Sequence, residues 1–247
     1  MPVGKPFIQL FEVDSTNNYA MAQVQASLAV HGTAWFAHQQ TSGKGQRGKA
    51  WLSNEKENII LSFAIDPSPL FIRDQFVISA ITALACVDLF KRYNINDVKI
   101  KWPNDVFCGD RKAGGILIEN VIQGQNWKFS IVGIGININQ TNFATDIVNA
   151  TSLAVLTGEQ YDPVLLAQEL CSIFEKRWST IISGNFQDIM KEYHDNLYKL
   201  DEVVSFKYEN AVFSATVLGV NFRGELRLDT GEEITLPSGR VTWLSTN

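Results

Sequence analysis

A short basic segment rich in glycine is the first place in this sequence where chemistry is expected. Residues 43–50 read G-K-G-Q-R-G-K-A. Residues 41–51 contain no acidic side chain but three basic ones, namely Lys44, Arg47 and Lys49. Glycine lets the backbone approach phosphate oxygens closely, and the cations can neutralise their charge. The segment therefore predicts a site for a small anion, although a solvated flexible loop could have the same composition.

Two nucleotide-binding fingerprints match this segment in part. Gly43, Gly45 and Gly48 satisfy the dinucleotide pattern G-x-G-x-x-G, and the pair Gly48-Lys49 nearly completes a P-loop. Both patterns need a helix that begins in or just after the loop and holds the phosphates with its amide groups. The following stretch, 50–58, has no apolar helical stripe, and it begins with an alanine that has no hydroxyl group for Mg²⁺. We therefore expect neither fingerprint to apply.

Charged and polar side chains also surround two later turns. K-W-P-N-D at 101–105 contains a proline that fixes the chain direction, so the turn presents the amide of Asn104 beside the carboxylate of Asp105. Lys112 precedes the pair Gly114-Gly115, where its ammonium group can point at a ligand brought against bare backbone. The alternatives are a structural turn with local hydrogen bonds and a hairpin-end lysine in solvent.

The segment G-I-G-I-N at 133–137 places two glycines on one face of an expected strand. Glycine weakens a strand and often marks the close approach of a ligand or of another backbone, although a sharp bend is the competing explanation. The histidines His31, His38 and His194 are scattered, and no Ser-His-Asp or Cys-His set suggests a protein nucleophile. We expect these histidines to be ordinary polar residues.

Composition excludes several classes of protein. The net charge is −5 and the pI is about 5.3, which does not favour a nucleic-acid binder. No run approaches 18 apolar residues, and the N-terminus lacks the apolar core of a signal peptide. Cys86, Cys108 and Cys171 are widely spaced without a C-x-x-C, so neither a disulfide framework nor a zinc ribbon is predicted. We expect a soluble cytoplasmic protein with reduced thiols.

The hydrophobic pattern places the candidate residues among mixed strands and helices. Strands are expected at 7–13, 33–40, 58–66, 98–102, 106–108, 115–122 and 127–138. Helices are expected from the cap residues 14–16 to about residue 28, and at 73–93, 150–156, 162–183 and 186–197. From about residue 201 the pattern changes to short strands separated by glycines, which predicts a small barrel after the larger domain.

The order of the motifs identifies a family. D-S-T-N at 14–17, Q-T-S-G-K-G-Q-R-G at 40–48, K-W-P-N-D at 101–105, K-A-G-G-I-L-I-E at 112–119 and G-I-G-I-N at 133–137 follow one another. In this combination the chain resembles the biotin protein ligases, also called biotin–[acetyl-CoA-carboxylase] ligases. The resemblance implies an α+β fold, with a mixed, largely antiparallel sheet flanked by helices, as in class II synthetases. It also implies a catalytic domain at 1–199 and an SH3-like barrel at 200–247.

The resemblance implies an activity and a set of site residues. Such ligases join the carboxylate of biotin to the α-phosphate of ATP, release pyrophosphate, and pass the biotinyl group of biotinyl-5′-AMP to a lysine of a carrier domain. The small molecules involved are then biotin, ATP and Mg²⁺, with unknown metal ligands. The implied biotin-binding residues are Ser15, Thr16, Asn17, Gln40, Lys44, Gly45, Gln46, Trp51, Lys112, Gly115, Gly133 and Gly135. The implied nucleotide-binding residues are Gly43, Arg47, Asn104 and Asn137.

Lys112 and Lys44 are implied to be catalytic, and we hypothesise a catalytic role for Asp105 as well. Lys112 would contact the biotin carboxylate and the α-phosphate, and Lys44 belongs to the loop that closes over the adenylate. Asp105 would be the polar partner of the acceptor lysine as that amine loses its proton. Where the family commonly has arginines in the loop, this chain has Lys44, Gln46 and Lys49. Because Gln46 removes a cation, we expect a weaker hold on biotinyl-5′-AMP and more leakage.

The resemblance also sets the expected partners. The first expected strand begins near Phe7, so we expect a monofunctional ligase without an N-terminal DNA-binding domain, and with neither DNA nor a membrane as partner. The expected partner is the biotin carboxyl carrier protein domain of acetyl-CoA carboxylase or of a related biotin-dependent carboxylase, and both a monomer and a homodimer are open. Two alternatives remain: a lipoate or octanoate ligase of the same fold, and a non-catalytic biotin-binding module. The first is expected to lack K-W-P-N-D beside this glycine loop, and the second to lack cations such as Lys112.

Overall fold

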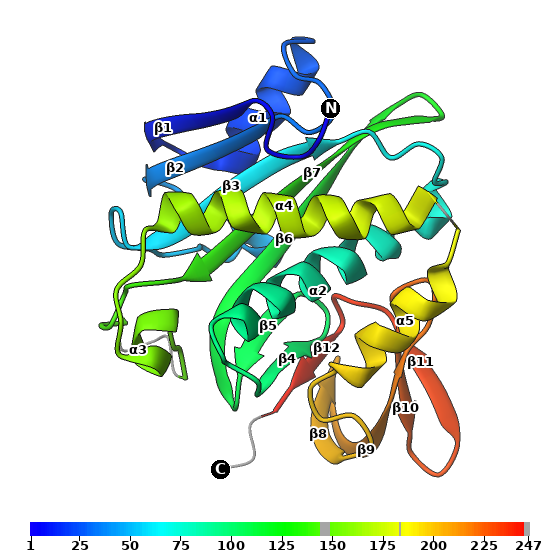
Figure 1. Cartoon of the computed structure of the whole chain (residues 1–247). Coiled ribbons are helices and arrows are strands. Elements are labelled where there is room, and N and C mark those ends of the chain that lie inside the picture. Colours follow the sequence, from blue (N-terminus) through cyan, green and yellow to red (C-terminus); the bar gives the residue numbers. More distant parts are fainter. Residues whose placement is uncertain (144–148, 183, 245–247) are drawn as a thin grey trace.

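A seven-stranded sheet forms the centre of the protein (Figure 1). The computed structural model describes residues 1–143, 149–182 and 184–244. The strands of this main sheet lie in the order β1 (Phe7–Val13), β2 (Ala34–Gln40), β3 (Asn58–Ile65), β7 (Asn126–Asn137), β6 (Arg111–Gln123), β5 (Asp105–Cys108) and β4 (Val98–Lys101). The pair β1–β2 is parallel and every other neighbouring pair is antiparallel. The expected mixed, largely antiparallel sheet is confirmed.

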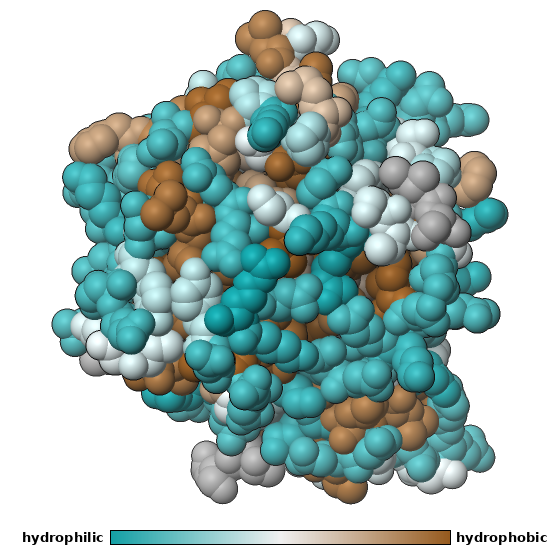
Figure 2. Space-filling model, in the orientation of Figure 1, coloured by the Kyte–Doolittle hydropathy of each residue, from teal (hydrophilic) through white to brown (hydrophobic). Residues whose placement is uncertain are grey.

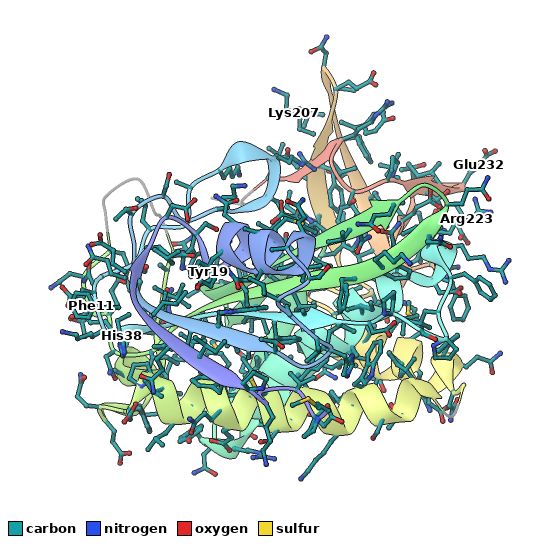
Figure 3. All side chains as sticks on the ribbon, turned by 90° about the horizontal axis from the view of Figure 1, so that it is seen from above. Phe11, Tyr19, His38, Lys207, Arg223 and Glu232 are labelled. Atoms are coloured by element: carbon teal, nitrogen blue, oxygen red, sulfur yellow. The ribbon has the colours of Figure 1, made fainter. Side chains whose placement is uncertain are left out.

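Helices cover both faces of the main sheet. Helices α2 (Phe76–Arg92) and α4 (Pro163–Ile182) pack together against one face, and α1 (Thr16–Gln25) packs against β2, β3 and β7 on the other (Figures 1 and 3). Each face has its own hydrophobic core, with Phe63 and Phe174 in the first and Trp35 and Ile131 in the second. The outer surface over α2 and α4 is mostly hydrophilic, with hydrophobic residues in separate patches (Figure 2).

The remaining helices are short. Helix α3 (Leu153–Thr157) follows the main sheet, α5 (Phe186–Asp195) leads to the C-terminal strands, and two single 3₁₀ turns lie at Gln46–Gly48 and Ile72–Asp74. No helix of the described residues is long and apolar enough to cross a membrane. The three cysteines are free and buried, and burial raises the pKa of each thiol to about 12.

A second, five-stranded antiparallel sheet follows and fits an SH3-like domain. Its strands are β8 (Val203–Tyr208), β9 (Ala211–Val220), β10 (Leu226–Asp229), β11 (Glu233–Leu236) and β12 (Val241–Trp243), in the order β11-β10-β9-β8-β12. Two tryptophans join this C-terminal sheet to the main sheet. Trp102 Nε1 donates to Gly224 O at 2.9 Å, and Trp243 Nε1 donates to Trp102 O at 3.1 Å. Trp102 is 1% exposed, so the joint between the two sheets is a buried contact.

Local details differ from the sequence-based expectations. Helix α1 ends at Gln25 rather than near residue 28, because Ser27 has a φ of 58° that a helix does not accept. Ser15 occupies the N-cap position, but its side chain makes no cap bond, so the expected capping oxygen is not used there. Strand β6 begins at Arg111 rather than at 115, since residues 111–115 pair with β5.

The start of α4 follows the expected capping chemistry, whereas the start of α3 does not lie where it was expected. Asp162 caps α4 as expected, accepting from Val164 N at 2.8 Å, and Pro163 is the first helical residue. Helix α3 starts at Leu153 rather than at 150, with Ser152 as its cap. Residue 183, the expected end of α4, lies outside the described residues.

Candidate functional site

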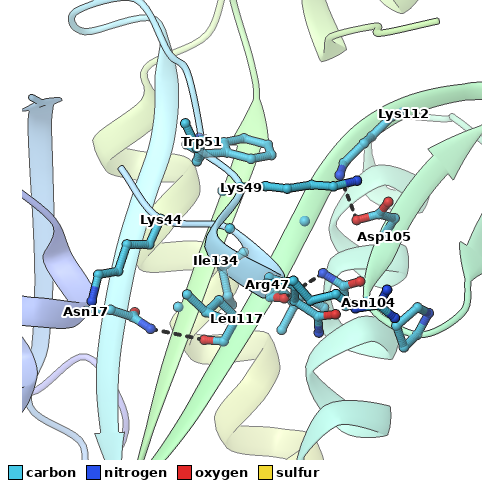
Figure 4. Close-up of a pocket in the computed structure, with 18 of the residues that line it drawn as sticks. Asn17, Lys44, Arg47, Lys49, Trp51, Asn104, Asp105, Lys112, Leu117 and Ile134 are labelled. Carbon is cyan, nitrogen blue, oxygen red and sulfur yellow. Dashed lines mark hydrogen bonds and ion pairs between the residues drawn. The ribbon is translucent and has the colours of Figure 1, made fainter. Parts of the chain in front are cut away.

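The predicted motifs converge on one cavity of about 320 Å³ at the end of the main sheet that faces the C-terminal sheet (Figure 4). Loops after β1 and β2, the β4–β5 turn, β6, β7 and β12 supply its walls. Of the residues predicted for the site, those lining the cavity are Ser15, Thr16, Asn17, Gln40, Lys44, Gly45, Gln46, Arg47, Trp51, Asn104, Asp105, Lys112, Gly115, Gly133 and Gly135. Segments far apart in the sequence are therefore brought to one place.

A buried polar network forms one end of the cavity. The Asn17 side-chain amide donates to Leu117 O at 3.2 Å and to Glu119 Oε2 at 2.8 Å, and its Oδ1 accepts from Ser62 Oγ at 2.6 Å. Gly133 makes this possible, since a Cβ there would overlap Asn17 Oδ1. Asn17 is 4% exposed, so the network holds a fixed amide at the cavity wall.

Gln40 closes the network from the neighbouring strand β2. Its side-chain oxygen accepts from the backbone N–H of Thr16 at 2.8 Å and from Thr16 Oγ1 at 3.2 Å. Ser15, whose side chain does not cap α1, is 1% exposed and lines the same end. Hydroxyl and amide groups, both donors and acceptors, suit a small neutral polar ligand group at this end.

The glycine loop is a closed turn rather than the start of a helix. Gly45 N donates to Lys49 O at 2.7 Å and Trp51 N donates to Gly43 O at 2.9 Å, with a single 3₁₀ turn between them. The chain after Trp51 is not helical. The two fingerprints that need a helix here are therefore both excluded, as expected, and the loop lies along the cavity with its cations.

Trp51 covers a slot floored by two glycines. Gly115 on β6 and Gly135 on β7 are opposite one another in the ladder, and a Cβ at Gly135 would overlap the Trp51 indole. The Trp51 Nε1 atom is buried and has no acceptor among the described residues. At Gly135, the close approach that was expected of the glycines in G-I-G-I-N is confirmed, here for a side chain of the protein itself.

A lysine–carboxylate pair lies beside the slot. Lys112 Nζ and Asp105 Oδ1 are 2.7 Å apart, and the Lys112 ammonium is 5.9 Å from the centre of the Trp51 ring. Both side chains are partly exposed to the cavity, at 35% and 25%. Asn104 is held in place because its side-chain amide donates to Ile116 O at 2.9 Å. A fixed ammonium group of this kind can stabilise charge that develops on a phosphoryl group.

Two predicted residues lie outside the cavity lining. Asn137 is 6% exposed, and its side chain donates to Thr151 O at 3.0 Å, so its amide is turned away from the cavity. Gly43 supports the loop, because a Cβ there would overlap Trp51 O. The structure thus gives both residues structural contacts, and their contact with a nucleotide stays a prediction.

Sequence reasoning missed the contribution of the C-terminal sheet. Val241, Thr242 and Trp243 line the cavity, although nothing in their local sequence marks them. It also left Lys101 unassigned, although that residue opens the motif K-W-P-N-D and lines the cavity. Apolar wall residues such as Ile134 read as ordinary core positions in the sequence.

Metal-binding groups are sparse around the cavity. Among the described residues, no three His, Cys, Asp or Glu side chains come together in a way that could hold a metal ion. Asp105 is the carboxylate residue of the cavity lining, and it is already paired with Lys112. One carboxylate of this kind fits a metal ion that is bound mainly by a phosphate ligand better than a metal ion that is held mainly by the protein.

Residues 10–137 match the biotin/lipoate A/B protein ligase family. The chain belongs to this family. The bifunctional ligase/repressor BirA of Bacillus subtilis is 30% identical over 210 residues, which are 83% of this chain and 64% of that protein. The biotin–[acetyl-CoA-carboxylase] ligase of Mycobacterium tuberculosis is 29% identical over 169 residues, which are 67% of this chain and 61% of that protein. The chain thus spans less than two thirds of the length of either relative.

Solved structures of family members share the whole fold. The biotin protein ligase from Aquifex aeolicus in complex with biotin and ATP has a TM-score of 0.82 and 24% identity, and the match covers 97% of this chain and 98% of that chain. A mutant of the same ligase in complex with biotin has a TM-score of 0.77 and 26% identity, with the same coverage. The match to these structures therefore includes both sheets of the present chain.

Proposed function

We propose that this chain is an ATP-dependent biotin–protein ligase. It forms biotinyl-5′-AMP from biotin and ATP and transfers the biotinyl group to a specific lysine of a biotin carboxyl carrier protein domain. Residues 1–199 form the catalytic domain and residues 200–247 the SH3-like domain. One observation carries the proposal: a single cavity joins a buried amide and hydroxyl end, a glycine-floored slot, and the pair Lys112–Asp105 under a basic loop.

Each part of the cavity suits one part of the substrates. The fixed amide of Asn17 and the hydroxyl of Ser15 suit the polar ureido group of biotin, and the Trp51 indole, which packs on Gly135, suits its apolar part. Lys112, which is paired with Asp105, would then contact the biotin carboxylate and the α-phosphate. Attack of one anion on another needs neutralising charge rather than a protein nucleophile, and no Cys or His is among the described residues lining the cavity.

Transfer needs a proton acceptor and a partner. The acceptor lysine must lose a proton before it attacks, and we assign the role of proton acceptor to Asp105, which lines the cavity. Mg²⁺ bound to ATP would neutralise phosphate charge, and the small number of protein donors among the described residues fits an ion held mainly by the phosphates. The relative from Mycobacterium tuberculosis is named for acetyl-CoA carboxylase, which supports a carboxylase carrier domain as the partner.

Biotin-dependent ATP–pyrophosphate exchange tests the proposal. We expect exchange with biotin and none with lipoate or octanoate, followed by labelling of a carboxylase carrier domain but not of its acceptor Lys→Arg variant. Exchange with lipoate and not with biotin would establish a lipoate ligase instead. Binding of biotin without any exchange would show a non-catalytic biotin-binding module.

A further inference from the structure

Lys101 ends strand β4 and lines the cavity, although the proposed function gives it no role. In the ladder, Lys101 is opposite Asp105, which is opposite Gly115, which is opposite Gly135. Opposite residues of antiparallel strands point to the same face, so these four residues form a row across β4, β5, β6 and β7. Neighbouring strands are about 4.8 Å apart, which places the Lys101 backbone roughly 10 Å from that of Gly115.

An aromatic cage surrounds the Lys101 ammonium group. Its Nζ is 4.6 Å from the ring centre of Phe107, 5.4 Å from that of Tyr198 and 5.8 Å from that of Trp243. Ring faces attract cations, so the cage holds the ammonium group in place. Within the described parts of the chain, no carboxylate forms an ion pair with Lys101, whereas Lys112 is paired with Asp105 at 2.7 Å.

The cage is rigid because both sheets build it. Trp243 on β12 donates from Nε1 to Trp102 O at 3.1 Å, and Trp102 is itself held by Gly224 O. Tyr198 OH donates to Asp110 Oδ1 at 2.6 Å, and Tyr198 N donates to Ile100 O at 2.9 Å. The C-terminal sheet therefore fixes the position of a cation in the main cavity.

The electrostatics around Lys101 favour an anion. Burial lowers the pKa of Lys101, the charge of Lys112 lowers it further, and Asp105 and Asp110 oppose the shift. The Lys101 ammonium group is partly buried, and Asp105 and Asp110 offset only part of the effect of burial on its pKa. Among the described residues, no carboxylate is its ion-pair partner. A phosphate oxygen would supply that partner and make a charge-assisted hydrogen bond.

We propose that Lys101 binds the β- and γ-phosphoryl groups of ATP, and hence the pyrophosphate that leaves. This inference rests on the proposed function, which puts the apolar part of biotin against Trp51, the residue that packs on Gly135, and puts the biotin carboxylate beside Lys112. Beyond Asp105 the row ends at Lys101. The β- and γ-phosphoryl groups of ATP extend in this direction from the reacting α-phosphorus.

The charge at Lys101 acts on the leaving group. As a carboxylate oxygen of biotin bonds to the α-phosphorus, the bond from that phosphorus to the bridging oxygen breaks, and its electron pair leaves with pyrophosphate. The Lys101 ammonium group offsets this developing charge. Biotinyl-5′-AMP has no β- or γ-phosphoryl group, so the second half-reaction does not use Lys101.

The two half-reactions provide the test. Lys101→Met is compared with Lys101→Arg and with the control Lys99→Met, whose lysine is on the same strand but outside the cavity lining and donates to Asp195 O. We expect Lys101→Met to raise the KM for pyrophosphate in exchange by about 10- to 100-fold. Lys101→Arg should stay within about fivefold of wild type because it keeps the charge.

Biotin affinity and the rate of transfer from supplied biotinyl-5′-AMP to the carrier domain should match those of Lys99→Met. Isothermal titration with pyrophosphate gives a readout without turnover, so it tests Lys101 even if the wild type shows no biotin-dependent exchange. If Lys101→Met does not fold, Trp243→Leu opens the cage and should raise the same KM. An unchanged affinity for pyrophosphate would overturn the proposal, as would a parallel loss of transfer from supplied biotinyl-5′-AMP.

Discussion

The substitution Gly133→Ala tests whether the polar end of the cavity is as rigid as its contacts indicate. A Cβ at Gly133 would overlap Asn17 Oδ1 and lie 2.8 Å from Asn17 Cγ. The Asn17 side chain is held by Leu117 O, Glu119 and Ser62, so it cannot move aside without losing hydrogen bonds. We therefore expect a loss of folding stability together with weaker binding of biotin.

The size of the effect follows from these contacts. Overpacking a buried position costs about 1–3 kcal/mol, and each lost hydrogen bond adds about 1 kcal/mol. A total of about 2–4 kcal/mol corresponds to a fall in Tm of roughly 5–15 °C for a chain of this size. The displaced amide should also weaken biotin binding at least about tenfold, measured by isothermal titration.

A matched control and a double-mutant cycle complete the experiment. Gly115→Ala places a Cβ no closer than 3.4 Å to Trp51 and 3.5 Å to Asp105, which is ordinary contact, so Tm should change by only about 2 °C. Asn17→Ala removes the amide that clashes, so adding Gly133→Ala to this variant should lower the folding stability little further. The reasoning is refuted if the stability losses of Asn17→Ala and Gly133→Ala add up in the double variant. It is also refuted if Gly133→Ala and Gly115→Ala have equal Tm values.

Three further results are expected. Asp105→Asn should slow single-turnover transfer to the carrier domain by about 100-fold, because it removes the proposed proton acceptor; unchanged transfer would remove that role. Gln46→Arg should reduce release of labelled biotinyl-5′-AMP during dialysis, because it restores a cation beside the adenylate; equal release from both proteins would contradict the proposed leakage. The hydrogen bond from Arg177 holds the pKa of Glu192 below 4.5, so this group contributes stability above that pH and loses it as the pH falls through the lowered pKa. Glu192→Gln should therefore cost at most about 1 kcal/mol at pH 7, since Glu192 is half-exposed, and denaturant unfolding should show the difference narrowing below about pH 4.5; a difference independent of pH would argue against the ion pair.

Strands were largely predictable because the hydrophobic pattern along a strand is a local property. The pattern at 7–13 predicts β1 correctly, and the paired glycines of G-I-G-I-N predict a face of close approach. Helix ends were less predictable, because the end of α1 depends on the left-handed conformation of Ser27 rather than on a sequence period. Ser15 shows the same limit, since it lines the cavity and its side chain does not cap α1.

The sequence by itself determined which chemical groups are available: the basic glycine loop, the amide and carboxylate of K-W-P-N-D, and Lys112. It also predicted the strands near them, because motif spacing and hydrophobic period act over a few residues, but it started β6 at residue 115 and so left Lys112 outside the strand. Only the tertiary structure decided that Trp51 covers the glycine slot, that Asn137 turns away, and that Trp243 encloses Lys101. Trp243 meets Trp102 across 141 residues of chain, and contacts of that range arise from the packing of two sheets, which no local pattern encodes.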